Sequence, residues 1–371
     1  MATIDRVDIS LVNLEPKVRR VDAMQSFERQ ETPIVVVTDS DGASGTGYCY
    51  TIGSGGPSVV ALLEHTLVPA LIGRDPSRIG GIWHDLLRLT HATSVGAITS
   101  LALAAIDTAL WDLHCRRANL PLWKAAGGTR ESVPVYSTEG GWLHIETGAL
   151  VEDALAMKER GFAGAKIKIG RPHASEDGVR LGAVRAAVGD GFDIMTDANQ
   201  AFTLAEAIRR AAVLEAHGVA WFEEPMPADN VEAHALLARA TGVPIAVGES
   251  LYSLSQFKEY LSRGAASIVQ VDVARIGGIT PWLKVAALAE AHGVEVCPHF
   301  LMELHLPLVC AVPNAHWLEY IPQLDELTGE PMRIEGGRAY PSDVPGLGID
   351  WDEGAIASRA VHTRSFRSAG S

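Results

Sequence analysis

Apolar and polar residues alternate along the first 50 residues in the manner of β-strands. Every second residue is apolar over 7–11, and 34–37 is a β-branched run. Farther along, apolar residues recur at helical spacing over 59–71 and 96–118. The first 125 residues are therefore predicted to form strands followed by helices, which together make an α+β layer.

The pattern changes after residue 128. Short apolar runs now alternate with alanine-rich amphipathic segments such as 205–217 and 281–293. The apolar runs cover residues 164–169, 193–197, 219–223, 245–249, 268–272, 294–298 and 316–320. A strand–helix unit repeated this regularly is typical of a parallel α/β fold. With about seven or eight units and no dinucleotide-binding glycine fingerprint, a (β/α) barrel is favoured over an open doubly wound sheet.

These changes of pattern also predict the domain organisation. Residues 1–128 are expected to form the N-terminal part of an α+β domain, and residues 129–322 the barrel. Beyond residue 322 the period is lost, and the tail 323–371 is expected to pack back on the first domain. At about 100–200 residues per domain, 371 residues suffice for this arrangement.

An ionisable residue stands at or just after the end of nearly every apolar run of the second region. In chain order these residues are Lys166, Lys168, Asp197, Glu223, Glu249, Asp272, His299 and Glu319. From Lys168 onward they are 20–29 residues apart, which is about one strand–helix unit. If the strands are parallel, all of these side chains lie at the C-terminal end of the barrel, where barrel enzymes keep their active sites.

Three of these residues, Asp197, Glu223 and Glu249, are carboxylates on consecutive strands. Brought together, they would repel one another unless a cation lay between them. Oxygen ligands alone select a hard ion, and Mg²⁺ is the expected one. The alternative is that each carboxylate caps the following helix or pairs with a surface lysine, which would have to happen at all three strand ends.

Two further pairs provide candidate bases. Lys166 and Lys168 share one face of a strand and are expected to lower each other's pKa, and a nearby metal ion is expected to lower it further, which suits one of them as a general base. The alternative is an exposed strand with two solvated lysines. Asp272 and His299 belong to neighbouring units, so the carboxylate is expected to orient the imidazole as a base rather than leave it a core histidine. Glu319 is expected to act as an acid if its pKa is raised.

Together these groups indicate a reaction type. A metal ion between a lysine and a histidine supports removal of the weakly acidic proton next to a carboxylate, because the ion offsets the charge of the enediolate that forms. We therefore predict an enzyme that acts on a small-molecule carboxylate.

Composition narrows the choice of partners and compartment. Lys and Arg number 31 and Asp and Glu 45, a formal charge of −14, so the surface is expected to repel nucleic acid and anionic membranes. The four cysteines form no C-x-x-C pair and the N-terminus lacks an apolar signal core, which predicts a cytoplasmic protein with reduced thiols. No run of about 18 uncharged apolar residues occurs.

At these positions the sequence resembles the enolase superfamily, and within it the mandelate racemase subgroup, over nearly its whole length. The resemblance implies a modified TIM barrel, (β/α)7β, with an α+β capping domain built from the N-terminal region and the C-terminal tail. It also implies one Mg²⁺ per subunit and a homo-oligomer, often an octamer. The implied roles are metal ligands for Asp197, Glu223 and Glu249, a K-x-K motif for Lys166 and Lys168, a dyad for Asp272 and His299, an electrophile for Glu319, and substrate contacts for Asn199 and Thr138.

The substrate class is indicated by residues 17–31, which correspond to the loop that covers the site in this family. The segment is rich in basic residues and poor in apolar ones. We expect Arg19 and Arg20 to bind a polyhydroxylated acid, and the alternative is a solvated mobile loop. Segments 139–144 and 299–305 also resemble those of talarate/galactarate-type dehydratases.

Three functions are compatible with these residues. The first is dehydration of an acid sugar to a 2-keto-3-deoxy acid, with Lys168 or His299 as the base. The second is racemisation or epimerisation of a 2-hydroxy acid, which needs the same two groups and the same intermediate. The third is a binding or structural protein on an inherited barrel, which conflicts with the presence of every motif residue. We predict the first.

Overall fold

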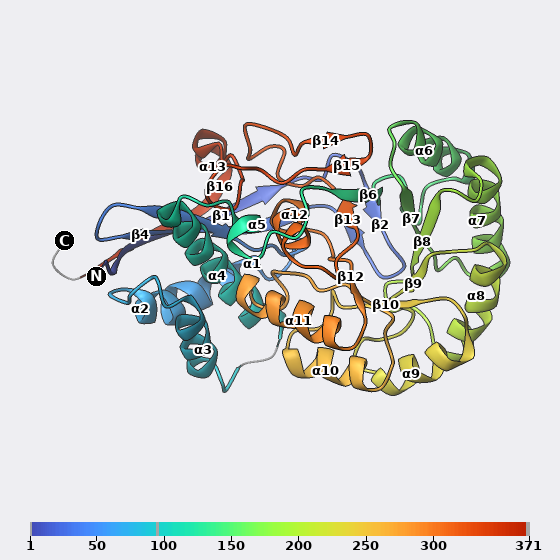
Figure 1. Ribbon diagram of the computed structural model, residues 1–371, viewed down its shortest axis with the longest axis horizontal. Coiled ribbons are helices and arrows are strands. Elements are labelled where there is room, and N and C mark those ends of the chain that lie inside the picture. Colours follow the sequence, from blue (N-terminus) through green and yellow to red (C-terminus); the bar gives the residue numbers. More distant parts are fainter. Residues whose placement is uncertain (1, 94–95, 369–371) are drawn as a thin grey trace.

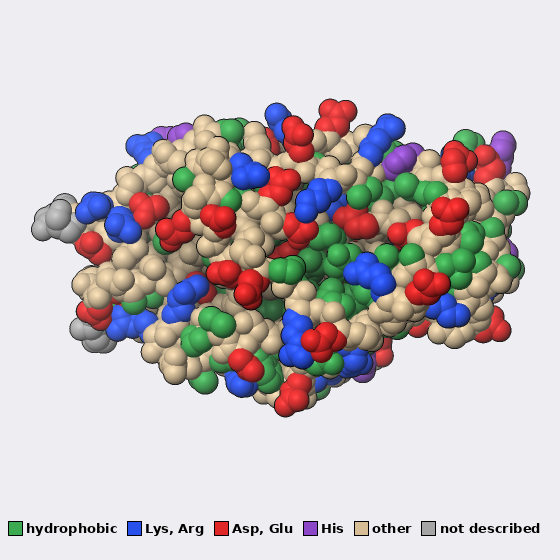
Figure 2. Space-filling view, turned by 90° about the horizontal axis from the view of Figure 1, so that it is seen from above, with side chains coloured by type: hydrophobic (Ala, Val, Ile, Leu, Met, Phe, Trp, Pro, Cys, Tyr) green, Lys and Arg blue, Asp and Glu red, His purple; other side chains and the backbone are tan. Residues whose placement is uncertain are grey.

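The computed structural model describes residues 2–93 and 96–368, which form two units (Figure 1). One unit, on the left of the view, is an antiparallel sheet with helices, and the other is a ring of strands surrounded by helices. On the face drawn in Figure 2, acidic and basic side chains are intermixed and form no broad basic surface. Within the described residues, no helix has the length and apolar character needed to cross a membrane.

The sheet of the first unit has the strand order β16-β1-β4-β5. Its strands are β1 (Ile4–Leu14), β4 (Gln30–Asp39), β5 (Ser44–Tyr48) and β16 (Ala360–Arg367). Helix α4 (Ala97–Ala118) lies against β5. A Cβ added at Gly45 would lie 2.3 Å from the Leu113 nitrogen, and one at Gly47 would lie 2.2 Å from the Ala109 nitrogen. Glycine at both positions therefore allows this close approach.

Shorter elements complete this unit. They are β2 (Arg20–Val21), β3 (Ser26–Phe27), α1 (Gly56–Leu62), the π-helical turn η1 (Leu63–Leu67), α2 (Val68–Leu71), α3 (Ile79–Leu89), α5 (Leu122–Ala125) and α13 (Glu353–Arg359). The single helix expected over 59–71 is divided by η1, which is followed by Pro69, a residue without an N–H to donate. β2 and β3 pair as a hairpin inside segment 17–31.

The second unit alternates eight parallel strands with seven helices. The strands are β6 (Val133–Ser137), β7 (Gly164–Lys168), β8 (Asp193–Asp197), β9 (Trp221–Glu223), β10 (Ile245–Val247), β11 (Ile268–Val269), β12 (Glu295–Val296) and β13 (Leu318–Tyr320). The helices are α6 (Thr147–Glu159), α7 (Ala174–Val188), α8 (Leu204–Ala216), α9 (Val231–Ala240), α10 (Leu254–Ser262), α11 (Ile279–Ala291) and α12 (Met302–Ala311). Parallel pairing of β13 with β6, together with a parallel bridge between Val296 of β12 and Ala315 just before β13, closes the ring, so the predicted (β/α)7β barrel is confirmed against the open sheet.

Large side chains fill the interior of the barrel. The buried cluster there consists of Tyr136, Met195, Trp221, Ala246 and Cys297. Met195 and Trp221 stand two residues before Asp197 and Glu223 on β8 and β9, and residues i and i+2 of a strand share a face. The packed interior therefore aims these two carboxylates along the barrel axis, at its C-terminal end.

The C-terminal tail contacts both units. β16 pairs antiparallel with β1 of the first unit. The tail also contains β14 (Ile334–Glu335) and β15 (Arg338–Ala339), and β15 pairs with β6 of the barrel. The tail thus links the capping sheet to the barrel, while the domain boundaries at residues 128 and 322 stay predictions.

Candidate active site

A cavity of about 140 Å³ opens between the β2–β3 hairpin and the C-terminal ends of the barrel strands. Its lining includes most of the residues that the sequence singled out. The predicted residues that line it are Thr138, Lys166, Lys168, Asn199, Glu249, His299 and Glu319. Asp197, Glu223 and Asp272 lie directly behind this lining, in contact with it.

The three predicted metal ligands converge at the floor of this cavity. Asp197, Glu223 and Glu249 are buried, and one carboxylate oxygen of each lies within 4.8 Å of the other two. Burial and the charge of Asp197 raise the pKa of Glu223 to about 7. Glu249 Oε2 accepts no hydrogen bond from the described residues, although it lies 3.1 Å from His299 Nε2. A buried, oxygen-only donor set with an orphaned acceptor fits a hard divalent cation.

Both lysines of the K-x-K motif point at these carboxylates. Lys166 Nζ lies 3.0 Å from Glu223 Oε1 and 2.7 Å from Glu319 Oε1. Lys168 Nζ forms an ion pair with Asp197 and donates to Asn199 Oδ1 over 3.0 Å. The alternative of an exposed strand is excluded, because Lys166 is 1% and Lys168 5% exposed.

The carboxylates around the two lysines outweigh the effect of each ammonium group on the pKa of the other. Burial and Lys166 do lower the pKa of Lys168, but the charges of Asp197, Glu223 and Glu249 raise it above the usual value. The pKa of Lys166 is raised as well, because nearby carboxylates outweigh its burial. The expectation of lowered values also included a nearby metal ion, and with that ion it stays a prediction.

Asp272 and His299 form the predicted dyad. His299 Nδ1 lies 2.9 Å from Asp272 Oδ2. Burial would raise the pKa of Asp272, but the hydrogen bond and the charge of His299 lower it to about 2. Burial lowers the pKa of His299, whereas Glu249 and Asp272 raise it above its usual value. The dyad therefore holds a proton on Nδ1 and presents Nε2 to the cavity.

Glu319 is a carboxylate rather than the expected acid. Burial would raise its pKa, but Lys166 and His299 lower it below the usual range. Thr138 Oγ1 donates to Glu319 Oε1 over 2.6 Å, and the Phe300 N–H donates to Oε2 over 2.8 Å. The expectation of a raised pKa is therefore wrong, because the site surrounds this group with donors and positive charge.

The backbone at the cavity is unusual in its dihedral angles. Asn199, Gln200, Glu224 and Phe300 have φ values of 43°, 66°, 35° and 67°, in the left-handed region that non-glycine residues rarely adopt. Asn199 accepts from Lys168 at the cavity, and its contact with the substrate stays a prediction. Such backbone conformations persist where the surrounding structure enforces them, which is typical of functional sites.

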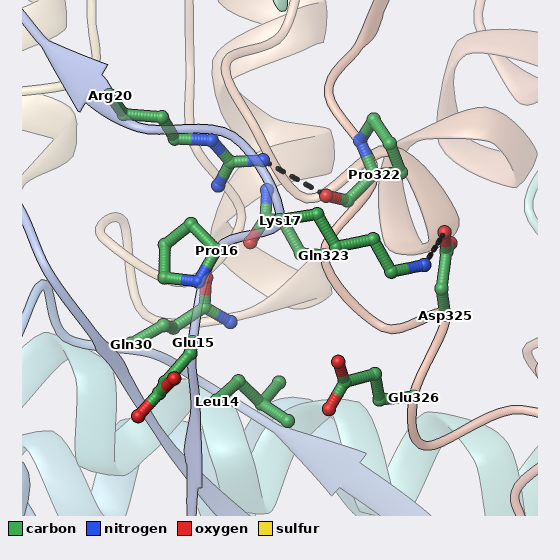
Figure 3. Close-up of a pocket in the computed structure, with 10 residues that line it drawn as sticks. All are labelled: Leu14, Glu15, Pro16, Lys17, Arg20, Gln30, Pro322, Gln323, Asp325 and Glu326. Carbon is green, nitrogen blue, oxygen red and sulfur yellow. Dashed lines mark hydrogen bonds and ion pairs between the residues drawn. The ribbon is translucent and has the colours of Figure 1, made fainter.

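The structure does not place Arg19 or Arg20 in this cavity. Arg19 is exposed. Arg20 is buried, forms an ion pair with Glu139, and donates to the Pro322 carbonyl over 3.0 Å (Figure 3). Arg20 lines a separate cavity of about 30 Å³. Arg20 therefore attaches the hairpin to the barrel, because Glu139 satisfies its charge.

A second basic residue of segment 17–31 is used in the same way. Lys17 Nζ lies 2.9 Å from Asp325 Oδ2, across the same small cavity (Figure 3). Lys17 and Arg20 thus tie the segment to the loop after β13.

Sequence reasoning missed Arg275 and Asp22. Arg275 Nη1 lies 3.6 Å from Glu249 Oε1, and its position three residues after Asp272 could have revealed it. Asp22 lines the cavity from the hairpin, and its Oδ1 accepts from the N–H groups of Met24 and Gln25. An acidic residue within a basic segment was the available signal for Asp22.

Family comparisons agree with this architecture. Residues 8–127 match the model of the mandelate racemase/muconate lactonizing enzyme N-terminal domain, and residues 149–355 match the enolase C-terminal domain-like model. The L-talarate/galactarate dehydratase of Salmonella typhimurium is 38% identical, covering 95% of this chain and 90% of that protein. The 3,6-anhydro-alpha-L-galactonate cycloisomerase of Streptomyces coelicolor is 36% identical, covering 96% and 99%.

Solved structures of relatives match over the whole chain. The Salmonella typhimurium L-talarate/galactarate dehydratase liganded with Mg and L-lyxarohydroxamate has a TM-score of 0.94 at 36% identity, covering 99% of this chain and 95% of that one. L-talarate dehydratase from Polaromonas sp. JS666, complexed with Mg and L-glucarate, has a TM-score of 0.92 at 35% identity and full coverage of both chains. The chain therefore belongs to the mandelate racemase subgroup of the enolase superfamily.

Proposed function

We propose that this protein is a Mg²⁺-dependent acid-sugar dehydratase. The observation that carries the proposal is the buried cluster of Asp197, Glu223 and Glu249, which lies between Lys168 on β7 and His299 after β12. This arrangement suits abstraction of a proton next to a carboxylate. Relatives named as dehydratases of talarate, galactarate, arabinonate and galactonate support the reaction class.

Asp197, Glu223 and Glu249 are the proposed ligands of one Mg²⁺ per subunit. Their fit rests on the oxygen-only donor set and on the orphaned Glu249 Oε2. When bound, the ion offsets the charge of the three carboxylates, which lowers the pKa of Lys168, and it polarises the substrate carboxylate as a Lewis acid. Structures of relatives that contain Mg support this assignment.

Proton removal is assigned to the two bases on opposite sides of the barrel. Lys168 takes the α-proton onto Nζ from one face of the substrate, or His299 takes it onto Nε2 from the other. Asp272 stabilises the imidazolium through Nδ1. Asn199, which contacts Lys168, is the proposed partner of the α-hydroxyl.

The oxygen of the developing enediolate is stabilised by Lys166 and its neighbours. Glu319 holds the Lys166 ammonium at 2.7 Å and the Thr138 hydroxyl at 2.6 Å. We assign the electrostatic role to the Lys166 ammonium, which Glu319 orients toward the substrate carboxylate while the Thr138 hydroxyl donates to Glu319 and holds that carboxylate in place.

Elimination completes the reaction. The electron pair left by the α-proton forms the C2–C3 double bond and expels the β-hydroxyl. His299 gives a proton to this hydroxyl, so water departs. The enol product takes up one proton at C3 and becomes a 2-keto-3-deoxy acid. The enol hydroxyl releases its proton as the keto group forms, so two protons are lost, from C2 and from the enol oxygen, and two are gained, by the leaving oxygen and by C3.

Racemisation or epimerisation of a 2-hydroxy acid is the second candidate, because bases on both faces allow a proton to be returned from the opposite side. Incubation of the Mg²⁺-loaded protein with aldonic, uronic and aldaric acids in deuterium oxide separates the two. A keto product with loss of water supports dehydration. Deuterium at C2 with the hydroxyl retained supports the second reaction. If no acid gives either result, the proposal is contradicted.

We further propose a cytoplasmic homo-oligomer, an octamer as the family resemblance implies, with no nucleic-acid or membrane partner. The charge of −14 disfavours anionic partners. The four cysteines are free and buried, as suits a reducing compartment. Light scattering on the purified protein tests the assembly, and a monomeric mass would contradict it.

A further inference from the structure

The capping unit supplies a side chain that contacts the Asp272–His299 dyad. Tyr50 follows β5 and is 1% exposed. Its hydroxyl donates to Asp272 Oδ2 over 2.7 Å, and the same oxygen lies 2.9 Å from His299 Nδ1. We propose that Tyr50 is a positioning residue, which holds Asp272 and through it His299 in the orientation that proton transfer requires. The inference rests on the proposed function of the dyad.

The hydroxyl of Tyr50 completes the hydrogen bonding of Asp272. Asp272 Oδ1 accepts from the backbone N–H groups of Ala274 and Arg275 over 2.8 and 3.1 Å. Oδ2 accepts from Tyr50 and His299. With donors on both oxygens, the carboxylate cannot rotate without losing hydrogen bonds. Without the Tyr50 hydroxyl, Oδ2 would be held only by the ring that it has to orient.

The direction of the Tyr50 proton is determined by Arg275. Arg275 Nε donates to the Tyr50 oxygen over 3.1 Å. Because a guanidinium has no acceptor, the tyrosine must use its own proton on Asp272. The ring is held as well, with its centroid 4.6 Å from that of Phe300. Tyr50 is therefore a fixed donor.

The backbone on the far side of Tyr50 is anchored inside the capping unit. Thr51 and Glu31 exchange backbone hydrogen bonds of 2.8 and 3.0 Å. Tyr50 thus connects the capping sheet with the base after β12. The hydrogen bonding of Asp272 is consequently complete only when the two units are packed together.

The contact between Tyr50 and Asp272 supports His299 and not Lys168. Lys168 contacts Asp197 and Asn199, and its ammonium lies 5.2 Å from the centre of the Trp142 ring. None of these groups contacts Tyr50 among the interactions of the described residues. Loss of the Tyr50 hydroxyl should therefore impair proton transfer at the His299 face and spare the Lys168 face.

The test compares Tyr50→Phe with wild type, both as the full Mg²⁺-loaded chain, on two acid sugars that are epimers at C2. In deuterium oxide, exchange of the C2 proton that faces His299 should slow about 10- to 100-fold, as is usual when a group supporting a reactive residue is removed. Exchange of the proton that faces Lys168 should stay within about twofold. Equal slowing of both epimers, or of neither, would overturn the proposal.

Tyr48→Phe is the matched control. Tyr48 is as deeply buried and only two residues away, but its hydroxyl has no hydrogen-bond partner within the described part of the chain. Tyr48→Phe should leave both exchange rates unchanged, and its melting temperature should not lie below that of Tyr50→Phe, which alone loses hydrogen bonds. In an Asp272→Asn background, Tyr50→Phe should cause no further loss, because the two groups act as one. Additive losses would indicate a merely structural role.

A measurement without substrate separates this inference from the proposed function. In ¹⁵N-histidine NMR spectra, the Nδ1–H signal of His299 should be sharp in wild type and Tyr48→Phe, and broadened in Tyr50→Phe. If no acid is turned over but this difference is seen, the proposed function fails and the positioning role stands. An unchanged signal in Tyr50→Phe overturns the positioning role, whatever the activity.

Discussion

The two ends of the barrel use ionisable side chains in opposite ways. At the C-terminal end these groups are buried and pair with one another, as Lys166 does with Glu223 and Glu319 at 3.0 and 2.7 Å. At the N-terminal end, Arg130 and Arg338 line an open groove and donate to backbone carbonyls. Solvent and neutral carbonyls satisfy the arginines at the N-terminal end. The buried groups at the C-terminal end depend instead on other charged side chains for their partners.

The backbone follows the same division. Among the described residues, five non-glycine residues have positive φ, and four of them lie at the C-terminal end of the barrel. The fifth, Asn119, ends α4 in the left-handed conformation common at helix C-termini. Concentration of strain and of buried charge at one end means that stability is given up there to hold reactive groups in place.

Among substitutions that test the contrast between the two ends of the barrel, we expect the largest effect from one at a proposed metal ligand. Glu249→Gln removes one negative charge. The change at Oε2 breaks no hydrogen bond, because this oxygen accepts none from the described residues. Because Lewis-acid stabilisation is worth several kcal/mol, we expect turnover to fall by about 10³-fold or more and Mg²⁺ affinity to drop in calorimetry.

Glu295→Gln is the control for this change, since Glu295 begins β12 at the other end of the barrel and is exposed. It should leave both turnover and Mg²⁺ affinity unaltered. Turnover by Glu249→Gln near the wild-type rate would refute the assignment of the metal site. Removal of metal with a chelator should likewise stop turnover, and added Mg²⁺ should restore it.

The next effect concerns the two bases. Lys168→Ala and His299→Asn should each lower the rate of keto-acid formation by about 10²- to 10⁴-fold, because a positioned general base contributes about that much. Both variants should still bind Mg²⁺, since neither residue is a proposed ligand. Lys258→Ala, on the exposed surface of α10, is the control. Full activity in both base variants would overturn the assignment of the bases.

A smaller effect tests whether buried carboxylates outside the site also titrate abnormally. Asp107 on α4 accepts from the Thr280 N–H at the start of α11, and burial raises its pKa to about 7. In the unfolded chain the pKa of this group lies near its ordinary value of 3.8, so between pH 3.8 and 7 the unfolded state binds fewer protons than the folded state. The free energy of unfolding should therefore fall as pH rises toward 7, and stay level above it.

Urea unfolding checks this prediction. Between pH 5 and 7, Asp107→Asn should remove about 2 kcal/mol of the decrease seen in wild type, since one pKa unit corresponds to about 1.4 kcal/mol. The same pH dependence in both proteins would show that Asp107 titrates normally. Unusual titration would then be limited to the cavity.

The smallest effect is expected at the N-terminal end of the barrel. Arg338→Ala removes hydrogen bonds of 2.9 Å to the Ser132 hydroxyl and carbonyl, both exposed to solvent. The free energy of unfolding should fall by less than about 1 kcal/mol, and turnover should change by less than about twofold. A large loss of activity would mean that the two ends of the barrel are not independent.

Sequence patterns predicted the barrel and the convergence of its ionisable residues because both follow from short-range periodicity. Residues at the ends of parallel strands must meet, so the placement of Asp197, Glu223 and Glu249 required no knowledge of packing. Segment 17–31 was harder to interpret. Its basic residues suggested an anionic substrate, but the partner of Arg20 is Glu139, a residue 119 positions away.

What the sequence determined by itself is the order of strands and helices and the identity of the groups that face the barrel axis. Tertiary structure alone decided their protonation and their supports. The pKa directions of Lys168 and Glu319 depend on charges that folding brings together, and so does the contact of Tyr50 with Asp272, 222 residues apart. Electrostatic interactions act through space, whereas periodicity acts along the chain, and for this reason only the second can be read directly from the sequence.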